Sequence, residues 1–306
     1  MALMEERIIL SGGSGMIGVA LTHTLSGEGA RVVKLVRGKA ESAGSVHWDP
    51  SSTQPLTDLS PLEGARAAIH LSGANLAAHR WTPAYKKEIF ASRVESTHAI
   101  VRLLQSLRRP PAVLVTASAV GIYGDRGEEK LTEQSAPGVG FLAETCRAWE
   151  AAADPATAAG IRVVHTRFGV VLDPHGGALA KVLPLFKAGL GGKLGDGAQW
   201  MSWITLGDLV RMVLHLIENP EISGPVNVVA PHPIRNSDYT RALGHALHRP
   251  AIMPAPAFAL RLALGEMADA ALLSSTRALP QKIESAGFRF EHPEIGPALA
   301  DLLLHS

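Results

Sequence analysis

Short apolar runs alternate with longer amphipathic stretches through the first half of the chain. The runs have the composition of buried strands, and they cover Arg7–Ser11, Arg31–Val36, Ser45–Trp48, Arg66–Ser72, Ala112–Ala117 and Ile161–Arg167. The amphipathic stretches have the apolar spacing of helices, and they cover Met16–Gly27, Thr82–Leu107 and Phe141–Ala159. This alternation predicts an α/β fold with a doubly wound parallel sheet. A ligand of such a sheet lies across the carboxyl ends of its strands.

The pattern changes after Arg167, where glycine and proline become frequent. Helices are predicted at Leu206–Asn219 and Asn236–His248, with a short strand at Gly224–Val229 between them. We therefore predict a sheet domain over residues 1–170, with its sheet completed by segments around residues 205–230. A smaller C-terminal substrate lobe is expected over residues 171–306, in which residues 250–306 form a helical C-terminal region.

One turn in the first half carries a ligand signal. The segment Gly12-Gly13-Ser14-Gly15-Met16-Ile17-Gly18 follows the first predicted strand and opens the first predicted helix. A dinucleotide-binding loop requires this context, because glycines let backbone N–H groups approach a pyrophosphate at the helix N-terminus. The alternative is an ordinary turn between a strand and a helix. The context favours a Rossmann-type domain that binds a dinucleotide.

The residue that follows the second strand indicates which dinucleotide binds. NAD enzymes usually place an acidic residue about 20 residues beyond the glycine motif, whereas this chain has Arg37 and then Lys39. A cation suits a ribose 2′-phosphate, so we expect NADP(H) in preference to NAD(H). The alternative is a solvated arginine just beyond a strand. Asp49 either reaches the adenine or caps the turn before Pro50.

Composition excludes several classes of partner. The net charge is +1, from 29 basic and 28 acidic residues, with no basic stripe, so nucleic acid is not expected as a partner. The single cysteine, Cys146, rules out an internal disulfide and fits a reducing compartment. Residues 1–7 lack the pattern of a signal peptide, and no apolar run reaches the roughly 18–20 residues of a membrane helix. We predict a cytoplasmic protein without a membrane contact, and a homodimer is left open.

These motifs resemble those of the extended branch of the short-chain dehydrogenase/reductase superfamily, the NAD-dependent epimerase/dehydratase group. The glycine turn, His70-Leu71-Ser72-Gly73 and the segment from Thr116 to Gly124 carry the resemblance. More narrowly, the chain is similar to an atypical, poorly characterised epimerase-like subfamily with a distinct C-terminal region, some members of which are named cell-division inhibitors. The narrower likeness rests on Arg80-Trp81-Thr82, Ser92-Arg93, the Gly195–Gln199 segment, Trp203-Ile204, Asp208, the Asn227–Pro231 segment and the tail from Pro280 to Phe290.

The resemblance implies a set of cofactor-binding residues. The glycine turn would hold the pyrophosphate, Arg37 the ribose phosphate, and Leu71 and Ser72 would lie beside the adenosine. Arg93 has a physical reason to belong, since a guanidinium can neutralise a phosphate; the alternative is a helix-surface ion pair with Glu88 or Glu95. The full set is Gly12, Gly13, Ser14, Gly15, Met16, Ile17, Gly18, Arg37, Leu71, Ser72, Gly73, Glu88, Arg93, Thr116 and Val171.

The acid–base pair usual in this superfamily is missing. Its enzymes carry a tyrosine and, four residues later, a lysine that lowers the tyrosine pKa. None of the three tyrosines here has that lysine, and the best register places Leu142 and Cys146 at the two positions. Ser118, at the superfamily's active-site serine position, and Tyr123 are therefore the catalytic candidates. The alternative is that residues 118–124, a strand end and loop, only form the floor of the cofactor pocket. Cys146 is expected to be a small buried hydrophobe.

The remaining candidates are less specific. No histidine pair has the spacing of a metal site, so no metal is predicted. Trp200 and Trp203 either line a substrate pocket or pack the lobes together. Two functions stay open: an NADP-dependent oxidoreductase or epimerase that acts on an unknown small molecule, and an NADP(H)-binding regulatory or redox-sensing protein without turnover.

Overall fold

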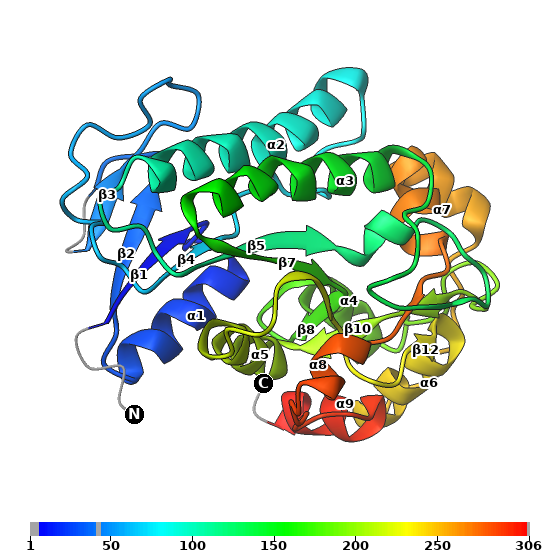
Figure 1. The fold of residues 1–306 in the computed structure, drawn as a ribbon. Coiled ribbons are helices and arrows are strands. Elements are labelled where there is room, and N and C mark those ends of the chain that lie inside the picture. Colours follow the sequence, from blue (N-terminus) through cyan, green and yellow to red (C-terminus); the bar gives the residue numbers. More distant parts are fainter. Residues whose placement is uncertain (1–5, 41–43, 305–306) are drawn as a thin grey trace.

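The computed structural model describes residues 6–40 and 44–304. Residues 1–5, 41–43 and 305–306 lie outside the described residues. The first of these ranges includes most of residues 1–7, for which no signal peptide was predicted. A seven-stranded parallel sheet runs in the order β11-β7-β5-β4-β1-β2-β3 (Figure 1). Its strands are β1 (Arg7–Ser11), β2 (Arg31–Val36), β3 (Ser45–His47), β4 (Ala67–His70), β5 (Val113–Ala119), β7 (Arg162–Phe168) and β11 (Gly224–Val228). The predicted α/β, doubly wound fold is confirmed.

Helices cover both faces of this sheet. On one face lie α1 (Met16–Gly27) and α5 (Leu206–Glu218), and on the other lie α2 (Pro83–Gln105) and α3 (Phe141–Ala153) (Figure 1). Ile8 and Leu10 of β1 pack in the core beneath α1 and α5, while Ile9 packs in the core beneath α2. Both faces of the strands are therefore apolar, which explains the nearly continuous apolar runs in the sequence.

The strand order places a crevice at the carboxyl edge of β1. The chain leaves β1 for β2 and β3 on one side, and β4 and β5 lie on the other side. Doubly wound sheets bind their ligands where the strand order reverses in this way. At this edge the ends of β1 and β4 stay paired, because the backbone N–H of Leu71 donates to the carbonyl of Ser11 at 3.1 Å.

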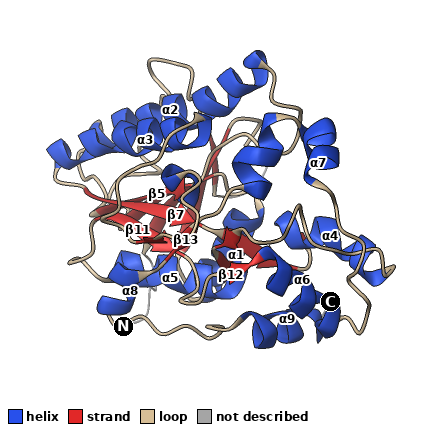
Figure 2. Cartoon of the chain, turned by 90° about the vertical axis from the view of Figure 1, so that its right-hand side faces the viewer, coloured by secondary structure: helices blue, strands red, loops and turns tan. Residues whose placement is uncertain are grey.

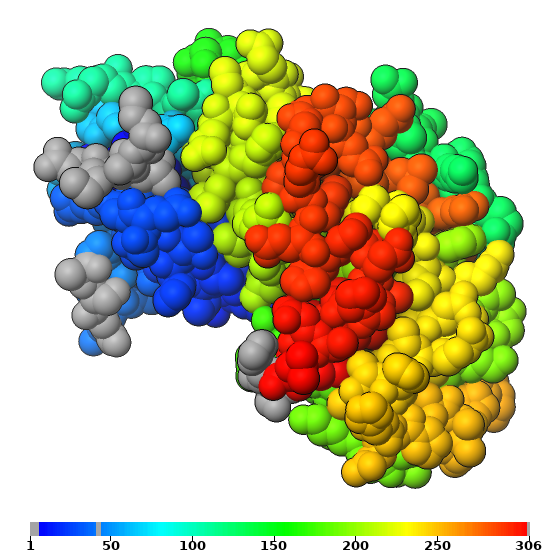
Figure 3. All heavy atoms as spheres, turned by 90° about the horizontal axis from the view of Figure 1, so that it is seen from below, coloured from blue at the N-terminus to red at the C-terminus, as the bar shows by residue number. Residues whose placement is uncertain are grey.

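The second half forms a lobe beside this edge and also returns to the sheet. The lobe contains α4 (Gly177–Lys187), α6 (Asn236–Ala246), α7 (Ala257–Leu264), a π-helical turn (Ala268–Leu273) and α9 (Ile295–Leu304) (Figure 2). Three strand pairs support it: β8 (Val170–Asp173) with β10 (Trp203–Thr205), β9 (Trp200–Met201) with β12 (Ile234–Arg235), and β13 (Arg277–Ala278) with β6 (Lys130–Leu131). The short helix α8 (Gln281–Ser285) instead lies near α5, where its Ile283 packs in the core of the sheet. From below, Figure 3 shows the blue N-terminal part and the red C-terminal part separated by yellow-green chain. None of the described helices has the length and apolar character that a membrane crossing requires.

Several element boundaries differ from those predicted. The helix predicted over Phe141–Ala159 ends as an α-helix at Ala153 and continues as a 3-10 turn, Asp154–Ala159. Pro155 lies in the first turn of this segment, where it has no N–H to continue the α-helical bonding. Residues 250–256 form an extended segment held by backbone bonds such as that from Met253 to Gly191, and not a helix.

Candidate functional site

Two glycines of the turn after β1 are required by the turn itself. Gly12 has φ +75°, and a Cβ there would lie 2.7 Å from the carbonyl carbon of Leu71. A Cβ at Gly18 would lie 2.3 Å from the carbonyl oxygen of Gly12. Both positions therefore exclude a side chain whether or not a ligand is present. They bring the start of α1 against the end of β4.

Gly15 is different, because its surroundings are open. Its φ is −77°, which any residue adopts, and a Cβ there would meet only the carbonyl oxygen of Gly12, at 3.6 Å. Ser14 and Gly15 are exposed, no side chain caps α1, and the first turn of α1 has no acidic residue. The first N–H groups of a helix lack acceptors within the helix and favour an anion. This end of α1 fits a pyrophosphate.

The second lobe closes over the start of α1. A Cβ at Gly176, in the loop after β8, would lie 2.6 Å from the sulfur of Met16. Val171 of β8 and Ile17 of α1 pack against the same core cluster. These two predicted cofactor residues are thus close to the turn as hydrophobic support. Gly13 lies against the aliphatic part of Lys34, since a Cβ at Gly13 would lie 3.5 Å from Cδ of Lys34.

Arg37 lies exposed immediately after β2, at the same edge of the sheet. Among the described residues it has no hydrogen-bond or ion-pair partner, and Lys39 is exposed two residues farther on. Asp49, in contrast, is engaged in its own turn. Its carboxylate accepts from the N–H of Ser51 at 2.9 Å and from the Ser51 hydroxyl at 2.6 Å, and these bonds lower the pKa of Asp49. The turn-capping alternative for Asp49 is the one that the structure shows.

Arg93 reaches from α2 to the end of β4. It donates to the carbonyl oxygens of Ala74 at 3.0 Å and Ile89 at 3.1 Å, and its guanidinium lies 5.1 Å from the centre of the Trp149 ring. Burial lowers the pKa of Arg93. No carboxylate pairs with it among the described residues, so the ion-pair alternative with Glu88 or Glu95 is not formed. An anion placed beside Gly73 would meet an uncompensated positive charge.

The other predicted cofactor residues occupy different environments. Leu71, Ser72 and Gly73 lie at the edge of the sheet, between the glycine turn and Arg93. Glu88 is exposed on α2 and does not share the position of Arg93. Thr116 is fully buried within β5, and its hydroxyl has no hydrogen-bond partner among the described residues.

A cavity of about 350 Å³ lies where the carboxyl ends of β5 and β7 meet α3 and the second lobe. From the sheet side it is lined by Ala119, Val120, Gly121 and Phe168, and from α3 by Leu142, Thr145, Cys146 and Trp149. Leu142 and Cys146, the two residues that the predicted register aligns with the tyrosine and lysine, thus face the cavity. Cys146 is buried in a hydrophobic cluster with Ile122 and Val229, as expected of a small buried hydrophobe. This burial raises the pKa of its thiol to about 12.

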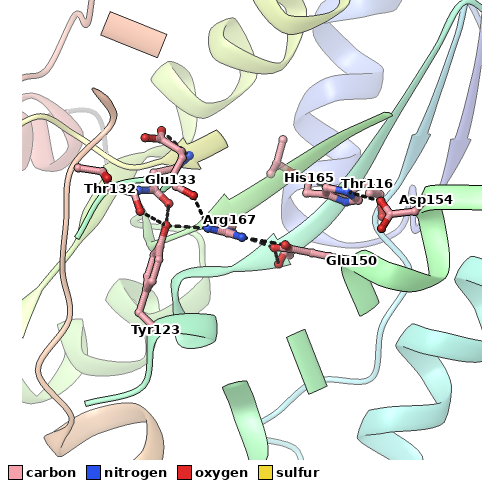
Figure 4. A network of polar contacts seen from close by, with 11 residues as sticks. Thr116, Tyr123, Thr132, Glu133, Glu150, Asp154, His165 and Arg167 are labelled. Atoms are coloured by element: carbon pink, nitrogen blue, oxygen red, sulfur yellow. Dashed lines mark hydrogen bonds and ion pairs between the residues drawn. The ribbon is translucent and has the colours of Figure 1, made fainter. Parts of the chain in front are cut away.

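Both catalytic candidates belong to a buried polar network. Figure 4 shows its members Tyr123, Arg167 and Glu150. The Ser118 hydroxyl donates to Glu150 at 2.7 Å, and Glu150 forms an ion pair with Arg167. Arg167 donates to the Tyr123 hydroxyl at 2.9 Å, which in turn donates to the side-chain oxygen of Asn227 at 2.7 Å. Burial raises the pKa of Tyr123, and the charge of Arg167 only opposes this effect.

The geometry does not favour proton transfer by either candidate. Neither Ser118 nor Tyr123 is among the residues that line the cavity, and Ala119 occupies the strand end there. Sequence reasoning missed Glu150 and noted Asn227 only within a segment that carries the family resemblance. No local pattern reveals that they partner these hydroxyls, because Glu150 is 32 residues from Ser118 and Asn227 is 104 residues from Tyr123 in the chain.

The structure also shows the surroundings of the two tryptophans and of His70. Trp200 lines the cavity, whereas Trp203 is fully buried and donates to the carbonyl of His232 at 3.0 Å. His70 is buried between Ser11 and Ser96, and burial lowers its pKa to about 3. Within the described part of the chain, no three His, Cys, Asp or Glu side chains gather as a metal site would require.

Comparisons with known proteins agree with this geometry. Residues 8–229 match the family model described as "NAD dependent epimerase/dehydratase family", and residues 255–302 match a domain of unknown function, DUF1731. The chain is similar to "Epimerase family protein Mb2239" of Mycobacterium bovis, with 41% identity over 292 residues, 95% of this chain and 96% of the relative.

Two solved structures extend the comparison. The first is the crystal structure of human epimerase family protein SDR39U1 (isoform2) with NADPH, which has a TM-score of 0.89 and 30% identity, and the match covers 98% of this chain and 100% of that one. The second is a nucleoside-diphosphate sugar epimerase from Corynebacterium glutamicum, with a TM-score of 0.79 and 35% identity, of which the match covers 59%. This chain belongs to the NAD-dependent epimerase/dehydratase family.

Proposed function

We propose that this protein binds NADP(H) across the carboxyl edge of its sheet and acts on a small molecule as an oxidoreductase or epimerase that lacks the tyrosine–lysine pair. The observation that carries the proposal is Arg37, an exposed cation without a partner among the described residues, which follows β2 at the sheet edge where the glycine turn follows β1. A cation at this place suits a 2′-phosphate. The NADPH in the similar human structure supports the same choice.

The chain's own residues divide the work of holding the cofactor. The first N–H groups of α1 and the open face of Gly15 would receive the pyrophosphate. Arg37 would bind the 2′-phosphate, and Arg93 would place positive charge at the cavity end, where position 146 has a neutral thiol. NADPH, when bound, supplies a hydride to a carbonyl carbon. The apolar wall of α3 would exclude water from that end of the cavity.

The cofactor preference is tested by titrating NADPH and NADH against wild type and Arg37→Ala. A charge-assisted contact is worth about 1.5–3 kcal/mol, so the variant should lose roughly tenfold or more in NADPH affinity and keep its NADH affinity. Arg31→Ala is the matched control, because Arg31 is an exposed arginine at the opposite end of β2. Equal wild-type affinities for the two cofactors, or tighter NADH binding, would overturn the preference.

Binding without turnover is the second candidate function. It is favoured by Leu142 and Cys146, which face the cavity where acid–base groups were expected and cannot exchange a proton near neutral pH. The two functions separate when NADPH-saturated protein is mixed with a panel of carbonyl compounds and the nicotinamide absorbance is followed. Enzyme-dependent loss of absorbance supports an oxidoreductase. Tight NADPH binding with no loss for any compound supports a regulatory or redox-sensing role.

A further inference from the structure

We propose that the cavity beside α3 takes an uncharged, largely apolar ring compound that carries a carbonyl group, and that it excludes nucleotide sugars. The inference rests on the proposed NADP(H)-binding function, because it identifies the class of molecule that the cofactor would meet. The nucleotide sugar is the natural competitor, since one similar structure is that of a nucleoside-diphosphate sugar epimerase. Three features of the cavity lining distinguish the two classes.

The first feature is charge. Arg93 is the one charged side chain among the described residues that line the cavity. Its guanidinium already donates to the carbonyl oxygens of Ala74 and Ile89, and it lies at the end where the cofactor is expected. A diphosphate brought in by a second nucleotide would need further cations to pair with, because an unpaired buried charge is costly. The described lining has no cation besides Arg93.

The second feature is the state of the polar side chains. The amide of Gln199 donates to the carbonyl oxygens of Leu194 and Leu272, at 3.2 and 2.9 Å. The Ser202 hydroxyl donates to the carbonyl of Thr276 at 2.9 Å, and Asn236 accepts from the N–H of Leu194 at 2.8 Å. These groups hold loops of the second lobe in place. These three side chains are therefore engaged. On the α3 wall, the Thr145 hydroxyl and the Trp149 indole N–H are buried without a hydrogen-bond partner among the described residues. Two such groups are fewer than the several hydroxyl groups of a sugar require.

The third feature is the shape and chemistry of the walls. Aliphatic and aromatic side chains come from α3 and from two parts of the second lobe, namely α4 with β9 and the π-helical turn. They include Trp149, Val182, Trp200, Met201 and Leu272. A volume of about 350 Å³ lies near the lower end of the range of small-molecule sites. It suits a compact ring system, which gains free energy as its apolar surface leaves water.

Tyr239 supplies a polar contact for such a compound. It lies on α6, lines the cavity and is 9% exposed, yet its hydroxyl has no hydrogen-bond partner among the described residues. Burial raises the pKa of Tyr239, so the hydroxyl keeps its proton and can donate it to an oxygen in a hydrogen bond. Two further donors of the lining, the Thr145 hydroxyl and the Trp149 indole N–H, are buried without a hydrogen-bond partner among the described residues. Donors without a partner in one cavity favour a ligand that carries an acceptor. The carbonyl oxygen of a ring ketone meets this requirement.

The test is isothermal titration of the full chain with 2-tetralone and, separately, with UDP-glucose, each with and without saturating NADPH. We expect 2-tetralone to bind and UDP-glucose to show no binding at the same concentrations. Tyr239→Phe should weaken 2-tetralone roughly two- to tenfold, the effect of one hydrogen bond. Leu272→Glu, which places a charge in the cavity, should weaken it more than tenfold. Leu262→Glu, on the exposed face of α7, should leave it unchanged.

The outcomes separate this inference from the proposed function. If NADPH fails to bind the wild type, the proposed function fails, while titration of the cofactor-free protein still decides between the two ligand classes. If NADPH binds and UDP-glucose binds as tightly as 2-tetralone, the inference is wrong and the proposed function stands. The inference is also wrong if 2-tetralone binds with the same affinity to wild type and Leu272→Glu, because the ligand then lies outside the cavity. The comparison of ligands on wild type does not depend on whether either variant folds.

Discussion

Arg167 on β7 and Glu150 on α3 form a two-bond ion pair, with 2.8 Å between Nε and Oε1 and 2.9 Å between Nη2 and Oε2. Both side chains are nearly buried, at 7% and 12% exposure. The same pair holds the Ser118 hydroxyl through Glu150 and the Tyr123 hydroxyl through Arg167. The two residues chosen as catalytic candidates from the sequence are thus partners of one ion pair that joins α3 to the sheet.

Loss of one member of this ion pair should lower stability strongly. Glu150→Ala leaves Arg167 buried without its carboxylate, and breaking a buried pair in this way costs about 3–5 kcal/mol. Urea unfolding measures the change in the free energy of unfolding. Glu129→Ala is the control, because Glu129 is 49% exposed in its pair with Arg126 and such pairs contribute about 0–1 kcal/mol. Equal losses in the two variants would show that the buried pair is not a special support of α3.

Tyr123→Phe should act on stability and leave cofactor binding unchanged. The variant removes the hydroxyl bonded to Arg167, Asn227 and the carbonyl of Thr132, and buried groups left without partners cost about 1–3 kcal/mol. Tyr239→Phe is the control, since its hydroxyl has no described partner to lose. Thermal unfolding and NADPH titration provide the two measurements. A loss of turnover on an identified substrate, without a loss of stability, would restore Tyr123 as the proton donor.

Gly15→Val should abolish cofactor binding in a folded protein. The position has ordinary φ, and a Cβ there meets only one backbone oxygen at 3.6 Å, so the fold tolerates the side chain. The valine would nevertheless occupy the space that a pyrophosphate needs in order to approach the backbone. Circular dichroism and NADPH titration test the two parts. Gly27→Val, at the other end of α1 with nothing within 4 Å, should bind NADPH normally. Normal binding by Gly15→Val would make this turn only structural.

His70 should make stability depend on pH in the acid range. Burial lowers its pKa in the folded protein to about 3, against 6.5 in an exposed chain. Between these values the unfolded chain binds a proton that the folded protein does not. The contribution of neutral His70 to the free energy of unfolding is therefore fully present above about pH 6.5. It falls as the pH decreases toward 3, by up to about 1.4 kcal/mol for each pH unit.

A pair of variants isolates this contribution. Urea unfolding at pH 7.5 and pH 5 should show a smaller loss of stability for His70→Gln than for wild type, because glutamine does not titrate. His23→Gln, at an exposed position on α1, should follow wild type. If His70→Gln retains the full acid loss, then His70 is not the group responsible for it.

The sequence by itself determined the sheet and the edge at which the glycine turn and Arg37 lie. The bounds of β1, α1 and β2 agree with those predicted, because the apolar period and the flanking glycines are local signals. The glycine turn and Arg37 were likewise readable, since strand ends and the residues that follow them lie at one edge in any parallel sheet. The absence of a tyrosine–lysine pair was also visible in the sequence alone.

Only the tertiary structure decided which side chains face the cavity. Successive residues of a strand point to opposite faces, and at the end of β5 this places Ala119 in the cavity lining while the Ser118 hydroxyl turns to Glu150. The partners of Tyr123 come from β7 and β11, and Tyr239 comes from α6 of the second lobe. Hydrogen bonds and cavities depend on the packing of distant segments, which no local period encodes, so these residues could be assigned only once the two halves of the chain were in place.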